Sequence, residues 1–470
     1  MNADLSRTRS LAEMGAILRV TAAKTPARNW VVGLRFDEQN LPSGTMPTRA
    51  EIDALCPERP LLILKHDGHT VLANSLAAKA AGITAKTPDP AGGVIDRDRD
   101  GSLAGVFRES AAQMMLSAMP APRVRTLING AAESFEKLLA QGITSAGAVL
   151  QTGGEGPSGK SGVYEIFLAA RLAPRIPINL YSILIADSAK VIENARRGPL
   201  TEEDEPGGHR VGAIKIYADG TFGSCTAHMH EPYADAPDKR GFLTIDEDEL
   251  YRRMEVAHCA GFQICIHAIG DATTRKCLDL FDVLLQNHPR PDHRHRLEHA
   301  SQLDEGTISD LARLGVAVST QPMFIHSEKA WLGKRLGATR TKMTYPFRSL
   351  IEAGVRVGGA SDAPIESTSV LEAIQVCVTR EGFEPSQCIT AEQAVRMYTI
   401  DAAYIQHEDH LKGSISPGKR ADFVVLSENP VRVAPEQISH IHVEQTIVGG
   451  RTVYDVYGKE HRSLPPPPPR

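Results

Sequence analysis

The sequence predicts an α/β protein built on a (β/α)8 TIM barrel that lacks its first strand, with an α/β insertion and a small C-terminal β-sandwich domain. The middle of the chain repeats a short, β-branched apolar run that ends in polar residues and is followed by a helical stretch. This alternation is typical of βα units around a parallel sheet. We count seven runs: ITSAGAV from Ile143, IPINLYSIL from Ile176, VGAIKIYADG from Val211, FQICIHAIGD from Phe262, HRLEHAS from His295, VAVSTQP from Val316 and VRVGGASDAP from Val355.

Seven βα units are one short of the usual barrel, because eight strands satisfy strand tilt and shear together. We therefore expect one strand to be missing or to lie upstream of the repeat. Residues 1–124 have a different sequence pattern, with a hairpin expected at RDRDGS. We expect them to form the α/β insertion that covers the barrel mouth. The barrel is expected to span residues 125–405.

The C-terminal part of the chain has a third sequence pattern. Residues 406–458 contain GSISPGKRADFVVLSENP and VEQTIVGGRTVYD, which predict two short strand pairs with Gly and Pro turns in a small β domain. Residues 459–470 end in LPPPPPR, and we expect a disordered or polyproline II tail that buries nothing.

The composition is that of an ordinary globular protein, with 42% hydrophobic residues, 23% charged residues and a formal net charge of -5. No nucleic-acid or anionic-membrane partner is expected from this balance. The chain has no apolar stretch of about eighteen residues and no cleavable signal, so we expect no membrane span and a cytoplasmic location. The seven cysteines are odd in number and lack CxxC spacing, which argues against a disulfide framework or a zinc ribbon.

The polar residues that close the runs are the informative ones, because active sites of (β/α)8 barrels lie at the carboxyl ends of the strands. They are rich in groups that can bind metals: Lys215, Asp219, His267, Asp271, Glu298, His299 and Asp362. Imidazoles and carboxylates that converge on one barrel mouth suit zinc or another borderline divalent ion. An aspartate beside such an ion can take a proton from bound water, whose pKa falls to about 7.

Four strings, IKIYADGTFGS, IHAIGD, RLEHA and GASDAP, follow one another in this order at successive strand ends. With them, the sequence resembles the amidohydrolase superfamily, in the branch that contains N-substituted formamide deformylase. WVVGLRFDE, GHTVLANS and GSISPGKRADFVVL extend the resemblance over nearly the whole chain. The resemblance implies a hydrolase of non-peptide carbon–nitrogen bonds, amide or N-substituted formamide in type, that acts through metal-activated water.

The resemblance also assigns the metal-site residues. It implies that Lys215 bridges two metal ions as a carbamate or binds directly, and that His267 and His299 are ligands. Asp362 would be both a ligand and the general base for the attacking water. The ordinary pKa of lysine, about 10.4, makes direct ligation costly, so carboxylation is the chemical route to an anionic oxygen ligand.

Family members also carry an HxH pair at the end of the first strand, and this chain has none before Arg125. The resemblance therefore implies that this strand and its ligands are cut off, either by a misassigned start codon or in a natural remnant. Lys215, His267 and His299 could still hold one zinc ion with a water molecule. We expect at best a mononuclear, weakened enzyme, and the absence of any tightly bound metal is the alternative.

Three HxH pairs occur elsewhere: His228 and His230, His293 and His295, and His440 and His442. The first pair lies in a loop near the mouth and could approach a metal, although a loop rarely presets ligand geometry. The second pair precedes a strand at the opposite end of the barrel, and we expect it to be exposed to solvent. The third pair is expected to open a strand of the small β domain.

His69, in KHDGHTVLANS, is the leading catalytic candidate of the N-terminal segment, because the resemblance places this stretch over the barrel mouth. It could orient a substrate carbonyl or close the pocket, and capping of a turn after Gly68 is an equal alternative. Arg108 and Glu109 are weaker candidates, whose charges could simply pair with each other.

The stretch QPMFIHSEKAWLGKRLG is expected to form a loop in which Phe324, His326 and Trp331 line the substrate pocket. An apolar lining favours an N-substituted amide or another bulky acyl group as the small-molecule substrate. Core packing is an equal alternative for Trp331.

Two other functions stay open. A lyase or isomerase could use the same barrel, since fold does not fix function. A truncated, inactive barrel could instead persist as a binding protein or be a gene fragment. Relatives often form dimers, so a homodimer is the oligomer that the resemblance suggests.

Overall fold

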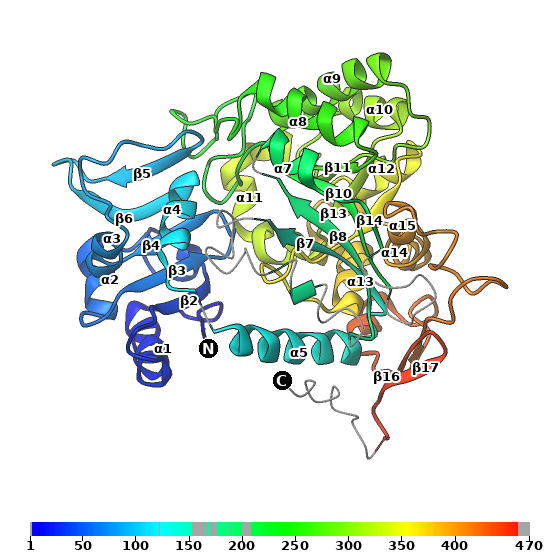
Figure 1. The fold of residues 1–470 in the computed structure, drawn as a ribbon, viewed down its shortest axis with the longest axis horizontal. Helices are drawn as coiled ribbons and strands as arrows, with labels where there is room; N and C mark the ends of the chain where they lie inside the picture. The colour runs from blue at the N-terminus through cyan, green and yellow to red at the C-terminus, as the bar shows by residue number, and fades with distance from the viewer. Residues whose placement is uncertain are drawn as a thin grey trace.

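The computed structural model describes residues 2–121, 123–152, 176–186, 188–199 and 208–458, together with positions 165, 168 and 169. The expected tail at 459–470 lies outside the described residues. Three sheets organise the chain, and Figure 1 shows the first of them, in blue and cyan, beside the second, in green and yellow. No helix in the described ranges is both long and apolar enough to cross a membrane.

The N-terminal segment (residues 2–121) forms a six-stranded mixed sheet in the order β1-β2-β3-β4-β6-β5. Its strands are β1 (Ala3–Asp4), β2 (Val31–Phe36), β3 (Leu61–Lys65), β4 (Thr70–Ala73), β5 (Gly93–Arg97) and β6 (Leu103–Glu109). Its helices are α1 (Leu11–Lys24), η1 (Glu38–Asn40), α2 (Arg49–Leu55), α3 (Ser75–Ala80) and α4 (Ser110–Ala118). β5 and β6 pair antiparallel, which confirms the hairpin expected at RDRDGS. The sheet separates two apolar clusters, one containing Leu18 and Ile63 and the other Leu62 and Phe107.

The second sheet, here called the barrel sheet, has the path β14-β13-β12-β11-β10-β8-β7, and the neighbours on this path are parallel. Its strands are β7 (Ser145–Gln151), β8 (Asn179–Ile185), β10 (His209–Tyr217), β11 (Gln263–Ala268), β12 (Arg296–His299), β13 (Ala317–Thr320) and β14 (Val357–Gly359), and the short β9 (Gly198–Pro199) pairs with β10. Each of the seven predicted runs overlaps one of the seven strands of this path, so the predicted strands are confirmed.

Helices cover the outer face of the barrel sheet (Figure 1). They are α5 (Val124–Ala140), α7 (Ala189–Asn194), α8 (Glu247–Cys259), α9 (Asp271–Asn287), α10 (Glu305–Leu314), α11 (Met323–Thr341), α12 (Phe347–Glu352), α13 (Val370–Thr379), η4 (Arg380–Gly382), η5 (Pro385–Gln387), α14 (Ala391–Met397) and α15 (Ile400–Tyr404). Side chains alternate along β10: Ile214 and Ile216 join the large apolar core that includes Leu278 of α9, whereas Ala213 packs with Ile183 and Cys265 on the inner face. Lys215, two positions after Ala213, therefore faces the barrel interior.

The barrel sheet curls but has two free edges in the described part of the chain, β7 and β14. Val149 of β7 is in register with Ile183 of β8, yet 44% of it is exposed, because no strand covers it from the other side. Around this gap, the Thr368 hydroxyl donates a hydrogen bond to the Gln141 side chain and so links the stretch before α13 to the end of α5. A TIM-barrel-like fold is therefore present, and the missing first strand stays a prediction.

The C-terminal region forms an antiparallel sheet of β15 (Phe423–Leu426), β16 (Val443–Val448) and β17 (Arg451–Asp455), preceded by η6 (Pro435–His440). β16 packs beside α5, where the Thr446 hydroxyl donates to the backbone oxygen of Leu139 (Figure 1). One sheet is seen here within residues 406–458, so the β-sandwich remains a prediction.

The turn between β3 and β4 fixes the N-terminal segment to the loops that follow β10 and β14. Lys65 Nζ donates to the backbone oxygen of Gly223 at 3.0 Å, and His66 Nε2 lies 2.9 Å from Glu366 Oε1. Asp67 accepts a hydrogen bond from the Ser224 hydroxyl at 2.5 Å. These contacts bring His69, the last residue of the turn, to the carboxyl end of the barrel sheet.

A glycine makes a second close approach between the two parts. Gly92 has φ 69°, and a Cβ built on it would lie 2.3 Å from the backbone oxygen of Thr244. Thr244 belongs to the loop after β10, and its amide donates to the oxygen of Ala218. Neither backbone can move easily, so this position requires glycine.

We expect Gly92→Ala to destabilise the protein much more than Gly101→Ala. Both glycines have positive φ, so alanine adds about 1 kcal/mol of backbone strain at each, but a Cβ on Gly101 would meet nothing within 4 Å. The clash with Thr244 should add roughly 1–3 kcal/mol at Gly92 alone. Urea-induced unfolding measures both losses, and equal losses would contradict the docking of the N-terminal segment on the barrel.

Candidate metal centre and active site

The four residues expected to form a metal site lie at the carboxyl ends of β10, β11, β12 and β14. Lys215, His267 and His299 are all buried, with 5%, 2% and 4% of their surfaces exposed. Asp362, in the loop after β14, remains accessible to solvent. Non-glycine residues with positive φ occur here, His299 at 75° and Asp362 at 54°. Strain of this kind persists where surrounding contacts hold it, and it is frequent at functional sites.

His267 has one ring nitrogen fixed by the backbone. Its Nε2 lies 3.0 Å from the carbonyl oxygen of Gly220, and because a carbonyl only accepts, Nε2 carries the proton. Nδ1 is then an acceptor with a free lone pair. Burial, together with the neighbouring His299, His69 and Lys215, lowers the pKa of His267 well below its usual value, so the ring is neutral.

His299 is oriented in the complementary way. Its Nδ1 lies 2.7 Å from Oε1 of Gln321, whose amide nitrogen in turn is 3.5 Å from the backbone oxygen of Ser319. Nδ1 therefore donates, and Nε2 keeps a lone pair. Burial and the charge of Lys215 lower the pKa of His299 to about 3. The two imidazole rings lie edge to face with their centroids 4.5 Å apart.

Lys215 influences the pKa values of the other three predicted site residues. Its charge acts on His267, His299 and Asp362, and its Nζ lies 5.1 Å from the ring centroid of Tyr217. Protein atoms around Asp362 partly shield its carboxylate from water and raise its pKa to about 6, although the charges of Lys215 and His69 oppose this rise. The structure therefore places His267 and His299 side by side, within range of the charge of Lys215, which also acts on Asp362. A joint role of the four residues as a metal site stays a prediction.

These residues fit one divalent ion. In metal sites, a ligating histidine donates its other ring N–H to a carbonyl or carboxylate, as His267 and His299 do. Among the described residues, no three His, Cys, Asp or Glu side chains are placed to hold a metal ion by themselves. Two imidazoles thus each keep one free lone pair, and Lys215 as a third ligand stays a prediction.

His69 stands beside this site with a carboxylate partner. Its Nδ1 lies 2.7 Å from Oε2 of Glu109, and its ring centroid lies 4.8 Å from that of His267. Glu109 also accepts a hydrogen bond from the Thr226 hydroxyl at 2.6 Å. Burial alone would lower the pKa of His69, but the charges of Glu109, Asp67 and Asp362 raise it to about 9. At neutral pH this imidazole is therefore a cation and a strong hydrogen-bond donor.

Arg108 and Glu109 do not pair with each other, contrary to the sequence-based expectation. They are neighbours on β6 and so point to opposite faces of the strand. Arg108 pairs with Asp96 at 2.7 Å, whereas Glu109 reaches His69.

The stretch expected to be a pocket-lining loop is the helix α11, so this expectation is wrong. Residues with good helix propensity, such as Ala, Leu, Lys and Glu, dominate it, and its one break in helical geometry is at Gly337. The helical period separates the three candidates, because Phe324 and Trp331 share a face and His326 does not.

The three candidate substrate residues have different surroundings. Phe324 stacks on His299, with ring centroids 5.7 Å apart and an interplanar angle of 9°. His326 is largely exposed and pairs with Glu381 at 2.8 Å. Trp331 packs against the large core, 5.6 Å from the Arg335 guanidinium. Substrate contact stays a prediction for all three, and Phe324 alone touches a metal-site residue.

None of the three HxH pairs is placed among the residues of the candidate metal site. His293 and His295 are buried, at 4% and 0% exposed, so their expected exposure to solvent is wrong. Burial costs little here because their ring nitrogens have partners, including the 2.8 Å contact between His295 Nε2 and His258 Nδ1. The charge neighbours of His228 are His230, Asp271 and Lys276 rather than the site residues. His440 and His442 precede β16 and are exposed.

Sequence reasoning missed the residues that orient the site. Gln321 fixes His299, and Tyr217 lies with its ring centroid 5.6 Å from that of His267. Both could have been found from the sequence. Gln321 lies at the polar end of the run VAVSTQP, and Tyr217 follows Lys215 by two positions and so shares its face of the strand. Asp219, expected among the ligand-type residues, accepts hydrogen bonds from the backbone amides of Ile269, Gly270 and His228 and ties two loops together.

A family model described as "Amidohydrolase family" matches residues 1–454. The protein of Bacillus subtilis named as an amidohydrolase, YtcJ, is 31% identical over 441 residues, which cover 92% of this chain and 80% of that protein. N-substituted formamide deformylase of Arthrobacter pascens is 29% identical, with 96% and 84% covered. A solved structure titled an uncharacterized metal-dependent hydrolase, from Pyrococcus horikoshii, shares the fold with a TM-score of 0.71 at 24% identity, over 93% of this chain and 83% of that one. The resemblance drawn from the sequence is thereby confirmed, and the missing HxH pair stays a prediction.

A carboxyl near the docked turn gives a pH-dependent stability that can be measured. Tyr345 donates to Glu328 of α11 at 2.5 Å, and burial raises the pKa of Glu328 from 4.5 to about 8. The folded state therefore keeps a proton that the unfolded chain releases, so this carboxyl lowers stability progressively as pH rises from about 4.5 to 8. We expect Glu328→Gln to raise the melting temperature by about 1–3 °C at the upper end of this range and less at the lower end.

The matched control is Glu305→Gln, at an exposed position in the first turn of α10. Its effect on the melting temperature should be similar across the same pH range. A Glu328→Gln effect that is equally independent of pH would show that this carboxyl is not held protonated.

Proposed function

The chain belongs to the amidohydrolase family, and we propose that it hydrolyses non-peptide carbon–nitrogen bonds, of the amide or N-substituted formamide type, with one divalent metal ion. The observation that carries the proposal is the pair of neutral imidazoles, His267 and His299, each with one nitrogen held by a carbonyl oxygen and the other left as an acceptor. The relatives named as a deformylase and as a metal-dependent hydrolase support the same reaction class.

Zinc is the expected ion, because imidazole suits borderline divalent metals. His267 Nδ1 and His299 Nε2 would be two ligands, and Lys215, once carboxylated, would supply an anionic oxygen as the third. Such an ion supplies Lewis acidity at the scissile carbonyl and a water molecule with a pKa near 7. The proposed site is mononuclear, with these three residues as its ligands.

Asp362 would move the proton of the attacking water. Its pKa of about 6 leaves it mostly ionised at neutral pH and still basic enough to accept a proton. The same group can then return that proton to the leaving nitrogen. Acid–base catalysis by a positioned carboxylate contributes roughly 10²–10⁴-fold to the rate.

His69 would bind the substrate oxygen. Its charge is fixed by Glu109, so an N–H bond is available to stabilise the negative charge that develops on a carbonyl oxygen during water attack. Phe324 and Tyr217 add aromatic surfaces beside His299 and His267. An apolar substituent on the amide nitrogen or acyl group suits these surfaces better than a small polar one.

The alternative of an inactive barrel is less well supported. An inert remnant has no need for two imidazoles that are buried, neutral and held in complementary tautomers. The buried His69–Glu109 pair likewise carries a cost in stability, because desolvating charged groups is unfavourable. A role in function accounts for keeping such a pair.

We expect Asp362→Asn to reduce kcat on a panel of N-substituted formamides and amides by about 10²–10⁴-fold. Asparagine has nearly the same shape but cannot accept the proton. Bound zinc, measured by mass spectrometry of the metal in the same samples, should be retained, because the imidazoles and Lys215 are unchanged.

The matched control is Asp238→Asn, at an exposed position in the loop after β10, which should leave kcat and zinc content unchanged. Loss of zinc together with activity in Asp362→Asn would assign this residue to holding the metal rather than moving a proton. Wild-type protein that contains zinc and hydrolyses none of the panel would reject the proposed reaction.

A further inference from the structure

The two residues that would act on the substrate beside the metal ion come from separate parts of the chain. His69 ends the β3–β4 turn of the N-terminal segment, and Asp362 lies in the loop after β14. They lie near each other, since the charge of each acts on the pKa of the other. A displacement of about 1 Å between reacting groups can cost roughly 10²-fold in rate. The proposed reaction therefore depends on how this turn and this loop are held relative to each other.

Each of the two stretches is braced by its own hydrogen bonds. In the turn, Oδ1 of Asp67 accepts from the backbone amides of His69 and Thr70, at 3.0 and 3.1 Å. In the loop, the amide of Ile365 donates to the carbonyl oxygen of Asp362 at 2.9 Å. The position of each stretch is then set by the contacts that it makes with other elements.

Glu366 joins the loop to the turn. Its Oε1 lies 2.9 Å from Nε2 of His66 and accepts a hydrogen bond from the Ser327 hydroxyl of α11 at 2.5 Å. His66 Nε2 is the donor in the first contact, because a carboxylate only accepts. Only 8% of Glu366 is exposed, so water has little access to compete for these donors.

The charges around His66 strengthen its contact with Glu366. Burial lowers the pKa of His66, but Glu366, Asp37 and Glu328 raise it, and the net direction is upward. A hydrogen bond from a charged imidazole to a carboxylate is roughly twice as strong as one between neutral groups. The contact therefore holds most firmly when the imidazole is protonated.

An apolar contact lies beside this junction. Gly68 has φ 72°, and a Cβ built on it would lie 2.7 Å from Cδ1 of Ile365. The backbone of the turn thus rests directly on a side chain of the loop. Two neighbouring contacts, at residues 66 and 68, oppose both sliding and rotation of the turn against the loop.

Ser327 brings a third element into the junction. It follows Phe324 by three positions and so lies on the same side of α11. Phe324 stacks on His299, with ring centroids 5.7 Å apart. Glu366 is therefore held both by the turn that carries His69 and by the helix that packs on a predicted metal ligand.

We propose that Glu366 is a positioning residue that clasps the loop of Asp362 to the turn of His69. The clasp, formed by Glu366, His66 and Ser327, sets the distance between the group that moves the proton and the group that binds the substrate oxygen. Its effect on the reaction rests on the proposed function, whereas the clasp itself is a property of the fold. Glu366 acts through its two protein partners and does not touch the substrate.

Steady-state kinetics of the full chain, loaded with zinc, on the panel of N-substituted formamides and amides tests the catalytic effect. Glu366→Leu removes the acceptor of both donors and should lower kcat by about 10- to 100-fold, with KM changed less than about threefold. Glu366→Gln keeps an oxygen that accepts from both donors, so its kcat should stay within about threefold of wild type. His66→Leu should also lower kcat, and adding it to Glu366→Leu should cause no further loss.

Hydrogen–deuterium exchange, followed by mass spectrometry, tests the clasp without any reaction. Glu366→Leu and His66→Leu should each speed exchange about tenfold or more both at residues 66–70 and at residues 362–366, because both stretches lose a contact that holds them. Glu366→Gln should leave both stretches at the wild-type rate. If Glu366→Leu does not fold, His66→Leu carries the test.

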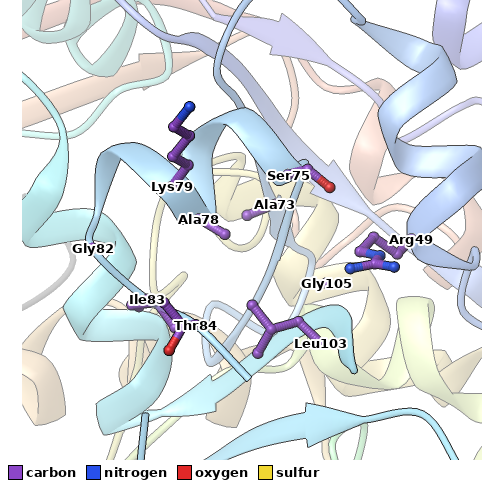
Figure 2. Close-up of a pocket in the computed structure, with 10 residues that line it drawn as sticks. All are labelled: Arg49, Ala73, Ser75, Ala78, Lys79, Gly82, Ile83, Thr84, Leu103 and Gly105. Carbon is purple, nitrogen blue, oxygen red and sulfur yellow. The ribbon is translucent and has the colours of Figure 1, made fainter. Parts of the chain in front are cut away.

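Two control variants accompany these measurements. Glu408 is also buried, at 7% exposed, and pairs with Lys412, which contacts Ser145 at the start of β7 and so at the opposite end of the barrel sheet. Glu408→Leu should lower the melting temperature without changing kcat or exchange at the clasp. Lys79→Met is the control within the N-terminal segment. Figure 2 shows the ammonium of Lys79 pointing away from the other residues that line a pocket between α2, α3, the end of β4 and the start of β6, and its loss should change neither measurement.

Three results would overturn the proposal. Faster exchange of the loop in Glu366→Leu, with the turn unchanged, would show that the two are not clasped. An unchanged kcat in a folded Glu366→Leu would remove the positioning role. A fall in kcat of the same size in Glu408→Leu would assign the effect to lost stability. Wild-type protein that hydrolyses none of the panel would reject the proposed function instead, and the exchange rates would still decide whether the clasp exists.

Discussion

The hydrogen bonds from the outer ring nitrogens of His267 and His299 are the constraint on which the chemistry of this protein depends. A carbonyl oxygen of Gly220 and an amide oxygen of Gln321 each fix one N–H, so each ring keeps one lone pair in a buried, low-dielectric position. Burial keeps both rings neutral, as a metal ligand must be. Without these two acceptors the imidazoles could rotate or change tautomer, and the directions of their lone pairs would no longer be fixed.

The N-terminal segment adds a charged residue to this region. Its β3–β4 turn is held by the loops after β10 and β14, and that docking places a charged His69 against His267. Burial raises the pKa of Asp362 and the charges of Lys215 and His69 oppose this rise, so that the pKa is about 6. One small turn therefore connects the packing between two sheets to the charge that lies beside His267.

Much of the barrel could be predicted from the sequence, because parallel strands buried on both faces are continuous apolar runs that end in polar residues. The positions of Lys215, His267, His299 and Asp362 at one edge followed from strand order alone. What sequence patterns could not supply was contact across the chain. His293 and His295 belong to a charged string, but they are buried because their ring nitrogens have partners such as the Leu314 carbonyl and His258. The aromatic residues of α11 suggest a pocket-lining loop, whereas its helix propensity decides the structure.

The central claim is that a single cation is held between two preset imidazoles and Lys215. Crystals of the protein grown with zinc and measured on both sides of the zinc absorption edge test it most directly. The account predicts one anomalous peak per chain, within about 2.0–2.1 Å of His267 Nδ1 and His299 Nε2, with a carboxylated Lys215 as a further ligand. A peak coordinated by other residues, or by His267 Nε2 after loss of its bond to Gly220, would contradict it.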